Sequence, residues 1–526
     1  MKPFLNYIFK EKNKVVLTLV FLFSYYCAVI VGQAWDEGFH LIQGKVVLDY
    51  LMSFGKIDKD ILYRENYSAI YWTLSHFFTN FFPKSFELEA SHLINTSVSI
   101  FTIIGIGKIS QQIFDKKTGS ITFLILFLFP IFFGHMAINS KDTILAFCHV
   151  WIFYSFIRYF KKQNTKRRNN YIFTIGILSA IGTGIQLVFL GSLLPLIVFF
   201  IIDIFYLKIF IRKDFKIQKL IIDLIKSFFI FYLLLIFFWI DAHENPLILP
   251  FKFLTETFSD TYWTGWPYSL INGEYITSTE VPASYLLKNF FYKTPEYLLI
   301  LYFIFFFILF FKNKNLSLKY TNLNIKILFI LLILIFPNLI LLFIPYPLYD
   351  GLRLFLWVIP YCCIIPALTL NYLLEKIKYK ISKVILSVLL ISFINLVVGF
   401  FLLTPYQYTY LNIFAGKKNV AHQKFENDYW GASLKELVKK TNFETKKSIS
   451  IYSCGINNGV LKKYMKKKYN NKFELVSEKS ADYIFMTNRT ISDANDNPTN
   501  CFEKYSGNNL FEVKRNGLLL SAVRKL

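Results

Sequence analysis

The apolar run VVLTLVFLFSYYCAVIVG, residues 15–32, is long enough to cross the hydrocarbon core of a bilayer as one helix. The polar stretch WDEGFH, residues 35–40, follows it almost at once. Two adjacent carboxylates, Asp36 and Glu37, therefore stand where an apolar segment gives way to water. An acid in that place can stay ionised, whereas ionisation at the bilayer centre costs several kcal/mol. Asp36 is thus a candidate general base; the alternative is that the pair only solvates the end of a loop.

The whole chain has the composition of an integral membrane protein. Of its 526 residues, 55% are apolar and 19% are aromatic, which is too apolar for a soluble globular protein. About eleven apolar runs of spanning length are separated by short polar breaks. Because these runs are continuous and do not alternate, they favour helices over a barrel. We expect an α-helical polytopic fold with about eleven transmembrane helices in residues 1–403.

The formal charge of +24 is explained by topology rather than by nucleic acid, because the basic residues cluster between the apolar runs. Residues 1–14 and 161–170 are rich in lysine and arginine and should be cytoplasmic. The first span then places Asp36 on the outer side of the membrane. The same alternation predicts outer loops at residues 33–91, 134–142, 241–296 and 345–353.

Beyond the last apolar run, residues 404–526 are of mixed polar composition and are long enough for a small α/β domain. Short apolar runs predict strands, and these alternate with helical stretches. Cys454 and Cys501 lie in this polar sequence and could pair if the domain occupies an oxidising compartment. No His or Cys cluster has the spacing of a metal site, so we expect neither a metal nor a cofactor. The strands are expected at 448–453 and 483–487, and the helices at 432–440 and 459–468.

One predicted outer loop, FGHMAINSKD at residues 133–142, carries His135, Asn139, Lys141 and Asp142 close to the membrane surface. It faces the same compartment as the first carboxylate pair. His135 either forms a hydrogen bond with a substrate phosphate or caps the helix that follows.

A second outer turn, YPLYDGLR at residues 346–353, joins Asp350 to Arg353. An Asp-Gly pair is typical of turns, so Asp350 either shapes the turn or contacts the acceptor. The outer cations Lys141, Arg353 and Arg64 could stabilise a departing phosphate. The alternative is that they contact only lipid head groups.

Aromatic residues gather in the long outer loop 241–296, among them Trp263 and Trp266. They either bind a sugar face or acyl chains, or they form an interfacial aromatic belt. The polar stretch Asp428-Tyr429-Trp430 either folds back as a lid or belongs to the core and turns of the C-terminal domain.

The carboxylate pair after the first span, the outer Lys-Asp loop and about eleven spans together resemble the C-type (GT-C) fold of glycosyltransferases that use lipid-phosphate sugars. The protein O-mannosyltransferase and aminoarabinose transferase families are the most similar. FGHMAINSKD, YDGLR, PYQYTYLN and FENDYWGASLKEL resemble a bacterial branch of this superfamily. The resemblance covers the membrane region. It implies a multi-pass protein of the bacterial inner (plasma) membrane, with a cytoplasmic N-terminus and a periplasmic C-terminal domain.

By this resemblance, Asp36 matches the acid that serves as general base towards an acceptor hydroxyl, and Glu37 matches its neighbour. Lys141 and Asp142 match a loop that lies near the donor phosphate in relatives. In the branch pattern His follows the arginine of the YDG turn, whereas leucine follows Arg353 here. This departure puts any His-dependent step at the turn in doubt.

The chemistry of such a transfer fits these residue types. Transfer from a polyprenyl phosphate requires a base on the acceptor and cations on the departing phosphate, because charge develops at both ends. Direct displacement inverts the anomeric centre. The expected partners are a polyprenyl-phosphate sugar donor, a lipid, glycan or protein acceptor, and membrane lipids. The chain has no nucleotide-sugar DxD motif and no phosphate-binding glycine loop, which favours a lipid-linked donor.

Two other classes of protein remain open. A flippase or transporter of lipid-linked sugars would have internal repeats and charged or broken helices at the bilayer midplane, and the sequence shows neither. A lipid-linked glycan polymerase or ligase is a neighbouring chemistry. The donor separates it from the transferase, because a polymerase needs an oligosaccharide diphosphate.

Overall fold

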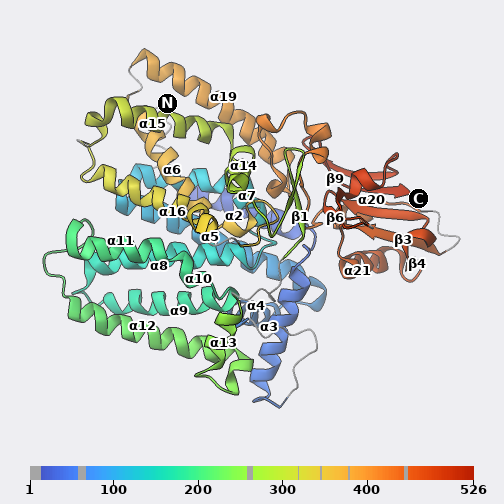
Figure 1. Cartoon of the computed structure of the whole chain (residues 1–526), viewed down its shortest axis with the longest axis horizontal. Helices are drawn as coiled ribbons and strands as arrows, with labels where there is room; N and C mark the ends of the chain where they lie inside the picture. The colour runs from blue at the N-terminus through green and yellow to red at the C-terminus, as the bar shows by residue number, and fades with distance from the viewer. Residues whose placement is uncertain are drawn as a thin grey trace.

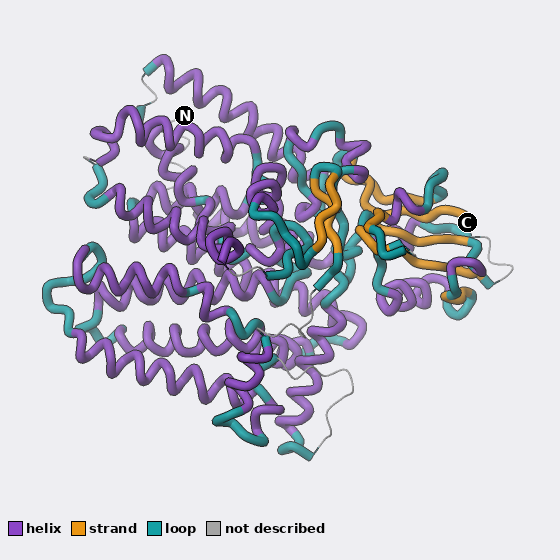
Figure 2. The backbone as a smooth tube through the Cα atoms, viewed as in Figure 1, coloured by secondary structure: helices purple, strands orange, loops and turns teal. Residues whose placement is uncertain are grey.

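The computed structural model describes residues 13–56, 67–257, 265–317, 319–343, 346–376, 379–443, 448–493 and 495–526. Its helices lie side by side in one bundle, and the C-terminal strands form a separate layer at one end of that bundle (Figure 1, Figure 2). The chain is a multi-pass membrane protein. Arg64 and Trp263 lie outside the described residues.

Five described helices are long and apolar enough to cross a membrane. A sixth span results if α14 (Ser284–Lys293) and α15 (Glu296–Ser317), which meet at a bend of 116°, count as one. The first combines η1 (Lys84–Phe86) with α5 (Glu87–Ile113), and the others are α8 (Asp142–Lys162), α12 (Ile217–Phe238), α16 (Leu323–Phe343) and α19 (Lys380–Leu402).

Other apolar runs fold as shorter or interrupted helices. The predicted span at residues 121–133 is divided between α6 (Lys116–Phe127) and α7 (Pro130–His135), because proline has no N–H for a continuing helix. The predicted span at 192–211 becomes α11 (Leu194–Ile202) followed by a single π-turn, η2 (Asp203–Leu207). The bundle is completed by α2 (Asn13–Ile30), α9 (Arg168–Ile185), α10 (Phe189–Ser192), α17 (Ile359–Cys362) and α18 (Ile364–Glu375).

Small residues let neighbouring helices approach closely, as is common in membrane bundles. Helices α5 and α6 cross at Gly107 and Gly119, where a Cβ on Gly119 would lie 2.5 Å from the carbonyl oxygen of Gly107. Within the predicted outer loop 33–91, α3 (Glu37–Met52) packs on α4 (Ile70–Thr79) at Gly44. A side chain at either crossing would force the helices apart.

The C-terminal region is a five-stranded mixed sheet in the order β4-β3-β5-β9-β8. Strand β3 is parallel to β4 and β5, whereas β9 is antiparallel to β5 and β8. The predicted α/β class is confirmed, because each predicted strand and helix overlaps an observed one. The bounds are β3 (Ile449–Cys454), β4 (Phe473–Leu475), β5 (Tyr483–Thr487), β8 (Phe511–Arg515), β9 (Leu518–Lys525), α20 (Leu434–Lys440) and α21 (Asn458–Tyr469).

Shorter elements connect the sheet to the bundle. A hairpin in the long loop after α12 is closed by Asn272 and Gly273, both with positive φ, as two-residue hairpin turns require. This loop also contains α13, and a second pair of short strands stands before α22. The bounds are α13 (Leu249–Glu256), β1 (Tyr268–Ile271), β2 (Glu274–Thr277), β6 (Thr490–Ser492), β7 (Pro498–Asn500) and α22 (Cys501–Lys504).

The two ends of the bundle differ, and we name them by what lies there. At the domain end, beside the C-terminal sheet, the backbone N–H of Trp35 donates to the carbonyl of Trp430 at 3.1 Å. At the basic end, the turn between α8 and α9 binds the loop before α12, where Asn164 Nδ2 donates to Asp214 Oδ2 at 2.9 Å. Figure 1 places the C-terminal sheet at one end of the bundle only.

Candidate functional site

One arginine forms ion pairs with three carboxylates at the domain end. Arg353 opens the short helix η4 (Arg353–Phe355), directly after the YDG turn. Its Nη1 lies 2.7 Å from Asp350 Oδ2 and 3.3 Å from Asp36 Oδ2, and its Nε lies 3.4 Å from Asp142 Oδ2. Only 5% of the Arg353 side chain is exposed. Residues from three separate loops therefore form one buried ion cluster, which we call the Arg353 cluster.

Asp36 is the solvent-accessible acid of the Arg353 cluster. Its side chain is 34% exposed, whereas those of Asp142 and Asp350 are 3% and 1% exposed. It stands at the N-cap position of α3, yet its carboxylate forms no capping hydrogen bond and faces Arg353 instead. This leaves an oxygen that can reach a hydroxyl arriving from water.

Electrostatics keep Asp36 ionised. Burial would raise the pKa of its carboxyl group, but the charges of Arg353, Lys141 and Arg489 outweigh burial and hold the pKa below the ordinary value. Burial also lowers the pKa of His40 to about 3, so its imidazole is neutral at physiological pH. The fixed cations are therefore the two arginines and the lysine.

Asp142 is held in place by its own loop. Asn139 Nδ2 donates to Asp142 Oδ2 at 2.9 Å, and Asn139 Oδ1 accepts from the backbone N–H of Asp142 at 2.9 Å. Asn139 thus closes the first turn of α8 and is fully buried. Lys141 points elsewhere, with its Nζ 3.3 Å from the hydroxyl of Tyr67.

The turn before Arg353 gives Asp350 its position. Asp350 and Gly351 have φ values of +57° and +67°, a left-handed conformation that aspartate tolerates and glycine favours. The turn aims one oxygen of Asp350 at Arg353 and the other at Arg489 Nη2, 3.4 Å away. Asp350 therefore both shapes the turn and bridges two arginines.

Two predicted site residues form their hydrogen bonds outside the Arg353 cluster. Glu37 Oε1 lies 2.6 Å from His92 Nε2 on α5, and its Oε2 accepts from the backbone N–H of Ala34 at 2.5 Å. His135 is fully buried, and its Nε2 lies 2.9 Å from the hydroxyl of Tyr429. Within the described chain His135 caps no helix; the cap that we considered for it is provided by Asn139.

Aromatic side chains cover both arginines. The guanidinium of Arg353 lies over the rings of Trp430 and Tyr349, with centroid distances of 4.8 and 5.1 Å. That of Arg489 lies 3.8 Å from the ring centroid of Trp266. Such stacking suits a guanidinium because its faces are weakly hydrated. Trp430 is buried and packed on the Arg353 cluster, so the stretch 428–430 belongs to the core of the protein.

The sequence alone did not reveal that the C-terminal region reaches the site. Arg489 follows strand β5 in the stretch TNRTIS, which has no motif that would single it out. Glu426 lies nearby in the quoted stretch FENDYWG; burial raises the pKa of its carboxyl group to about 7, against the lowering effect of Arg489. The only available signal was position, because a polar residue directly after a buried strand often lies at a sheet edge that faces a site.

The geometry supports acid, base and phosphate chemistry. The ionised carboxylate of Asp36 has access to water and lies 3.3 Å from the buried guanidinium of Arg353. Lys141 is close enough to lower the pKa of the Asp36 carboxyl group. Such a set can accept a proton on one side and stabilise an anion on the other. Among the described residues, no three His, Cys, Asp or Glu side chains gather as a metal site would require.

A family match agrees with this chemistry. Residues 69–239 match the family model described as dolichyl-phosphate-mannose-protein mannosyltransferase. The match covers about a third of the chain and agrees with the resemblance found in the sequence. No curated protein matches the chain.

Solved structures provide a second comparison. ArnT from Cupriavidus metallidurans in the apo state is 13% identical over 90% of this chain and 93% of its own, with a TM-score of 0.49. ArnT bound to undecaprenyl phosphate is 11% identical over 98% of each chain, with a TM-score of 0.46. The Archaeoglobus fulgidus oligosaccharyltransferase is 11% identical over 90% of this chain and 66% of its own, with a TM-score of 0.49. These identities are too low to transfer the role of any residue.

Proposed function

We propose that the protein is an inverting glycosyltransferase that moves a sugar from a polyprenyl-phosphate carrier to a hydroxyl group of a lipid, glycan or protein acceptor. One observation carries the proposal: Arg353 contacts Asp36, Asp142 and Asp350 at the domain end of the bundle. Burying an arginine with three acids is costly unless every charge is compensated. A cluster of this kind, open to water only at Asp36, is suited to catalysis.

The proposed step is a single displacement. An oxygen of Asp36 takes the proton of the acceptor hydroxyl while the hydroxyl oxygen bonds to the anomeric carbon. The bond between that carbon and the phosphate oxygen breaks, and the polyprenyl phosphate leaves with the electron pair. Arg353 and Lys141 stabilise the negative charge of the leaving phosphate. Attack opposite the leaving group inverts the anomeric carbon.

The remaining predicted site residues have supporting places in this scheme. Asp142, which Asn139 fixes in place, and Asp350 each form an ion pair with the guanidinium of Arg353. Glu37 acts from a distance, because its carboxylate anchors the start of α3 to His92. We assign it a structural role next to the base.

We further propose that residues 1–403 form the membrane domain in a bacterial inner membrane, with the N-terminus cytoplasmic and residues 404–526 periplasmic. Basic loops join one another at the basic end, and such loops normally face the cytoplasm. The site residues of three predicted outer loops meet at the opposite end. The C-terminal region contains a Cys454–Cys501 disulfide, a bond that persists in oxidising compartments.

The test is sugar transfer by the purified full chain in proteoliposomes, with undecaprenyl phosphate carrying one of a panel of radiolabelled monosaccharides. Asp36→Asn should lower the rate about 10²- to 10⁴-fold, the usual contribution of a general base. The matched control is Asp49→Asn in α3, the helix that Asp36 precedes, because Asp49 is 44% exposed and its ion-pair partner among the described residues is Lys45. Full activity of Asp36→Asn would refute the assignment of the base. Activity only with an oligosaccharide diphosphate would indicate a polymerase or ligase.

A further inference from the structure

Arg489 enters the site from the C-terminal region and is fixed on several sides. Its Nη2 lies 3.4 Å from Asp350, its guanidinium stacks on Trp266, and its Nη1 donates to the carbonyl of Tyr429. Only 4% of its side chain is exposed. Asp350 also binds Arg353 at 2.7 Å, so its carboxylate bridges Arg489 and the arginine proposed to bind phosphate.

A disulfide supports the backbone of Arg489. Cys454 ends β3 and Cys501 begins α22, and the bond joins two segments that are 47 residues apart. The N–H of Cys501 donates to the carbonyl oxygen of Arg489 at 3.0 Å. Gly455 lies against both, because a Cβ there would be 2.8 Å from Arg489 Cβ and 3.0 Å from Cys501 Sγ.

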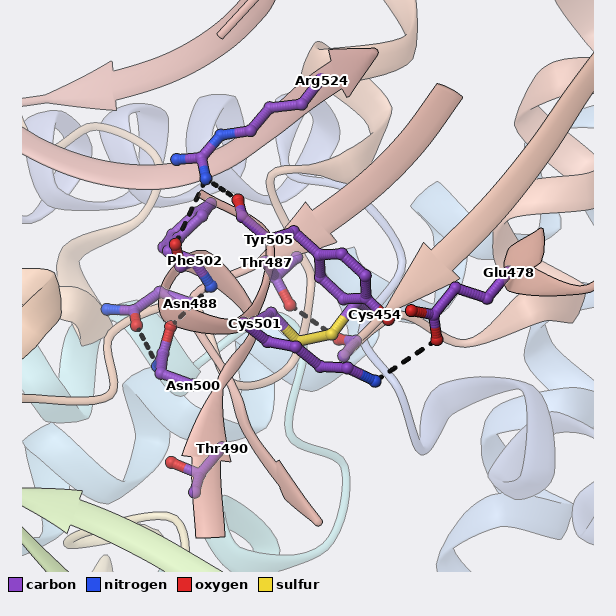
Figure 3. The surroundings of a disulfide bond; sticks show 12 residues. Cys454, Glu478, Thr487, Asn488, Thr490, Asn500, Cys501, Phe502, Tyr505 and Arg524 are labelled. Carbon is purple, nitrogen blue, oxygen red and sulfur yellow. Dashed lines mark hydrogen bonds and ion pairs between the residues drawn. A yellow bond between two sulfur atoms is a disulfide. The ribbon is translucent and has the colours of Figure 1, made fainter. Parts of the chain in front are cut away.

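Further hydrogen bonds fasten the same loop to the sheet. The hydroxyl of Thr487 donates to the carbonyl of Gly455 at 2.6 Å, next to the disulfide in Figure 3. Asn500 Nδ2 donates to Asn488 Oδ1 at 2.7 Å, which Figure 3 also shows. The residues directly before Arg489 are therefore bound to both ends of the disulfide-closed segment.

We propose that Arg489, held by the Cys454–Cys501 disulfide, is a positioning residue for donor binding, which balances Asp350 and so leaves Arg353 free to bind the donor phosphate. This inference rests on the proposed function. It makes the C-terminal region part of the donor site, and it makes the oxidised state of the cysteines a requirement for full donor affinity.

The physical reason is charge balance. Three cations, Arg353, Arg489 and Lys141, stand against three carboxylates, Asp36, Asp142 and Asp350. Loss of Arg489 removes one positive charge from this group and leaves Asp350 with Arg353 as its remaining ion-pair partner among the described residues. A phosphate anion approaching such a group is repelled, and the effect is strong because little water screens it. Lysine at position 489 would restore the charge but neither the stacking on Trp266 nor the simultaneous contacts with Asp350 and the carbonyl of Tyr429.

The experiment measures the dissociation constant of undecaprenyl phosphate for the full chain in lipid nanodiscs. Arg489→Gln should weaken binding about tenfold, and Arg489→Lys should recover part of that loss. The double variant Cys454→Ser/Cys501→Ser should weaken binding about threefold in the natural chain. In the Arg489→Gln background it should cause no further loss, because the disulfide acts through Arg489.

Arg524→Gln is the matched control. Arg524 is a second buried arginine beside the same disulfide, where its Nη1 donates to the carbonyls of Phe502 and Tyr505 (Figure 3). This variant should lower the thermal midpoint of the C-terminal region but change undecaprenyl phosphate binding less than twofold.

Three results would overturn the inference in different ways. Unchanged binding by Arg489→Gln would remove Arg489 from the donor site. Equal losses on removing the cysteines with and without Arg489 would show that the disulfide acts elsewhere. A natural chain that does not bind undecaprenyl phosphate would overturn the proposed donor site itself, and the inference with it. If Asp36→Asn abolished sugar transfer while Arg489→Gln bound undecaprenyl phosphate normally, the proposed function would hold and the inference about Arg489 would fail.

Discussion

Ion clusters stand at both ends of the helical bundle, and they are built very differently. At the basic end Lys319 Nζ lies 2.6 Å from Glu375 and 3.5 Å from Asp115, with these side chains 30–39% exposed. At the domain end Arg353 meets three acids with only 5% of its side chain exposed. Charged groups of the same kinds are therefore solvated at the basic end and buried at the domain end.

The difference separates a structural ion pair from a site. An exposed pair that joins helix ends costs little to form and contributes about 0–1 kcal/mol. A buried cluster loses the hydration of every charge and recovers it only through close pairing. A fold retains such a cluster when the charges do something that apolar residues cannot do. In this protein the water-accessible member of the buried cluster is the proposed base, Asp36.

Removing the central cation of each cluster should produce the largest difference between the two ends. Arg353→Gln should destabilise the protein by about 3–5 kcal/mol, because it leaves buried carboxylates unpaired. Lys319→Gln should cost no more than about 1 kcal/mol, because water solvates its former partners. Thermal and denaturant unfolding in the same detergent measures both. Similar losses at the two ends would contradict the distinction drawn here.

A pH-dependent effect is expected at the domain end. Burial raises the pKa of Glu426 from 4.5 to about 7, so the folded protein binds more protons there than the unfolded chain between these pH values. The contribution of Glu426 to stability therefore falls as the pH rises through this window, by about 3 kcal/mol at most. Glu426→Gln should remove this contribution, as seen by comparing the thermal midpoints of the variant and the natural chain from pH 5 to 8.

The exposed glutamate Glu474 on β4 provides the control. Glu474→Gln should leave the pH dependence of the natural chain unchanged. If Glu426→Gln retained the full pH dependence, the titrating group would lie elsewhere.

A smaller effect is expected at the rim of the Arg353 cluster. Lys141 lies near Asp36 but binds Tyr67 rather than an acid in the structure, so its ammonium group can turn to a phosphate. Lys141→Met should weaken binding of undecaprenyl phosphate about tenfold, the value of one charge-assisted hydrogen bond. Lys45→Met, at a lysine 64% exposed on α3, should change nothing. Equal effects of the two variants on binding would show that Lys141 does not contact the donor phosphate.

Much of the architecture could be predicted from the sequence. Apolar length gave the helical membrane class, and the change of composition after residue 403 gave the α/β region. Strand β5 was predicted with its exact observed bounds at 483–487. The number of transmembrane helices was harder to predict, because the length of an apolar run does not show whether a residue such as Pro130 divides it into two helices.

The site could be predicted only in part. Local sequence indicated Asp36, Asp142 and Arg353, since each stands in a short polar loop between apolar runs. It could not indicate that Glu37, adjacent to Asp36, turns to His92, because helix phase and packing decide that direction. Nor could it indicate Arg489, whose place in the site depends on how a distant sheet docks on the bundle.

The most direct test of the account is a cryo-EM structure of the natural chain in nanodiscs with undecaprenyl phosphate bound. The account predicts the phosphate at the domain end, within hydrogen-bond distance (about 3 Å) of Arg353 or Lys141, with the carboxylate of Asp36 facing the same space. A phosphate bound at the basic end, or one separated from Asp36 by the bundle, would contradict it.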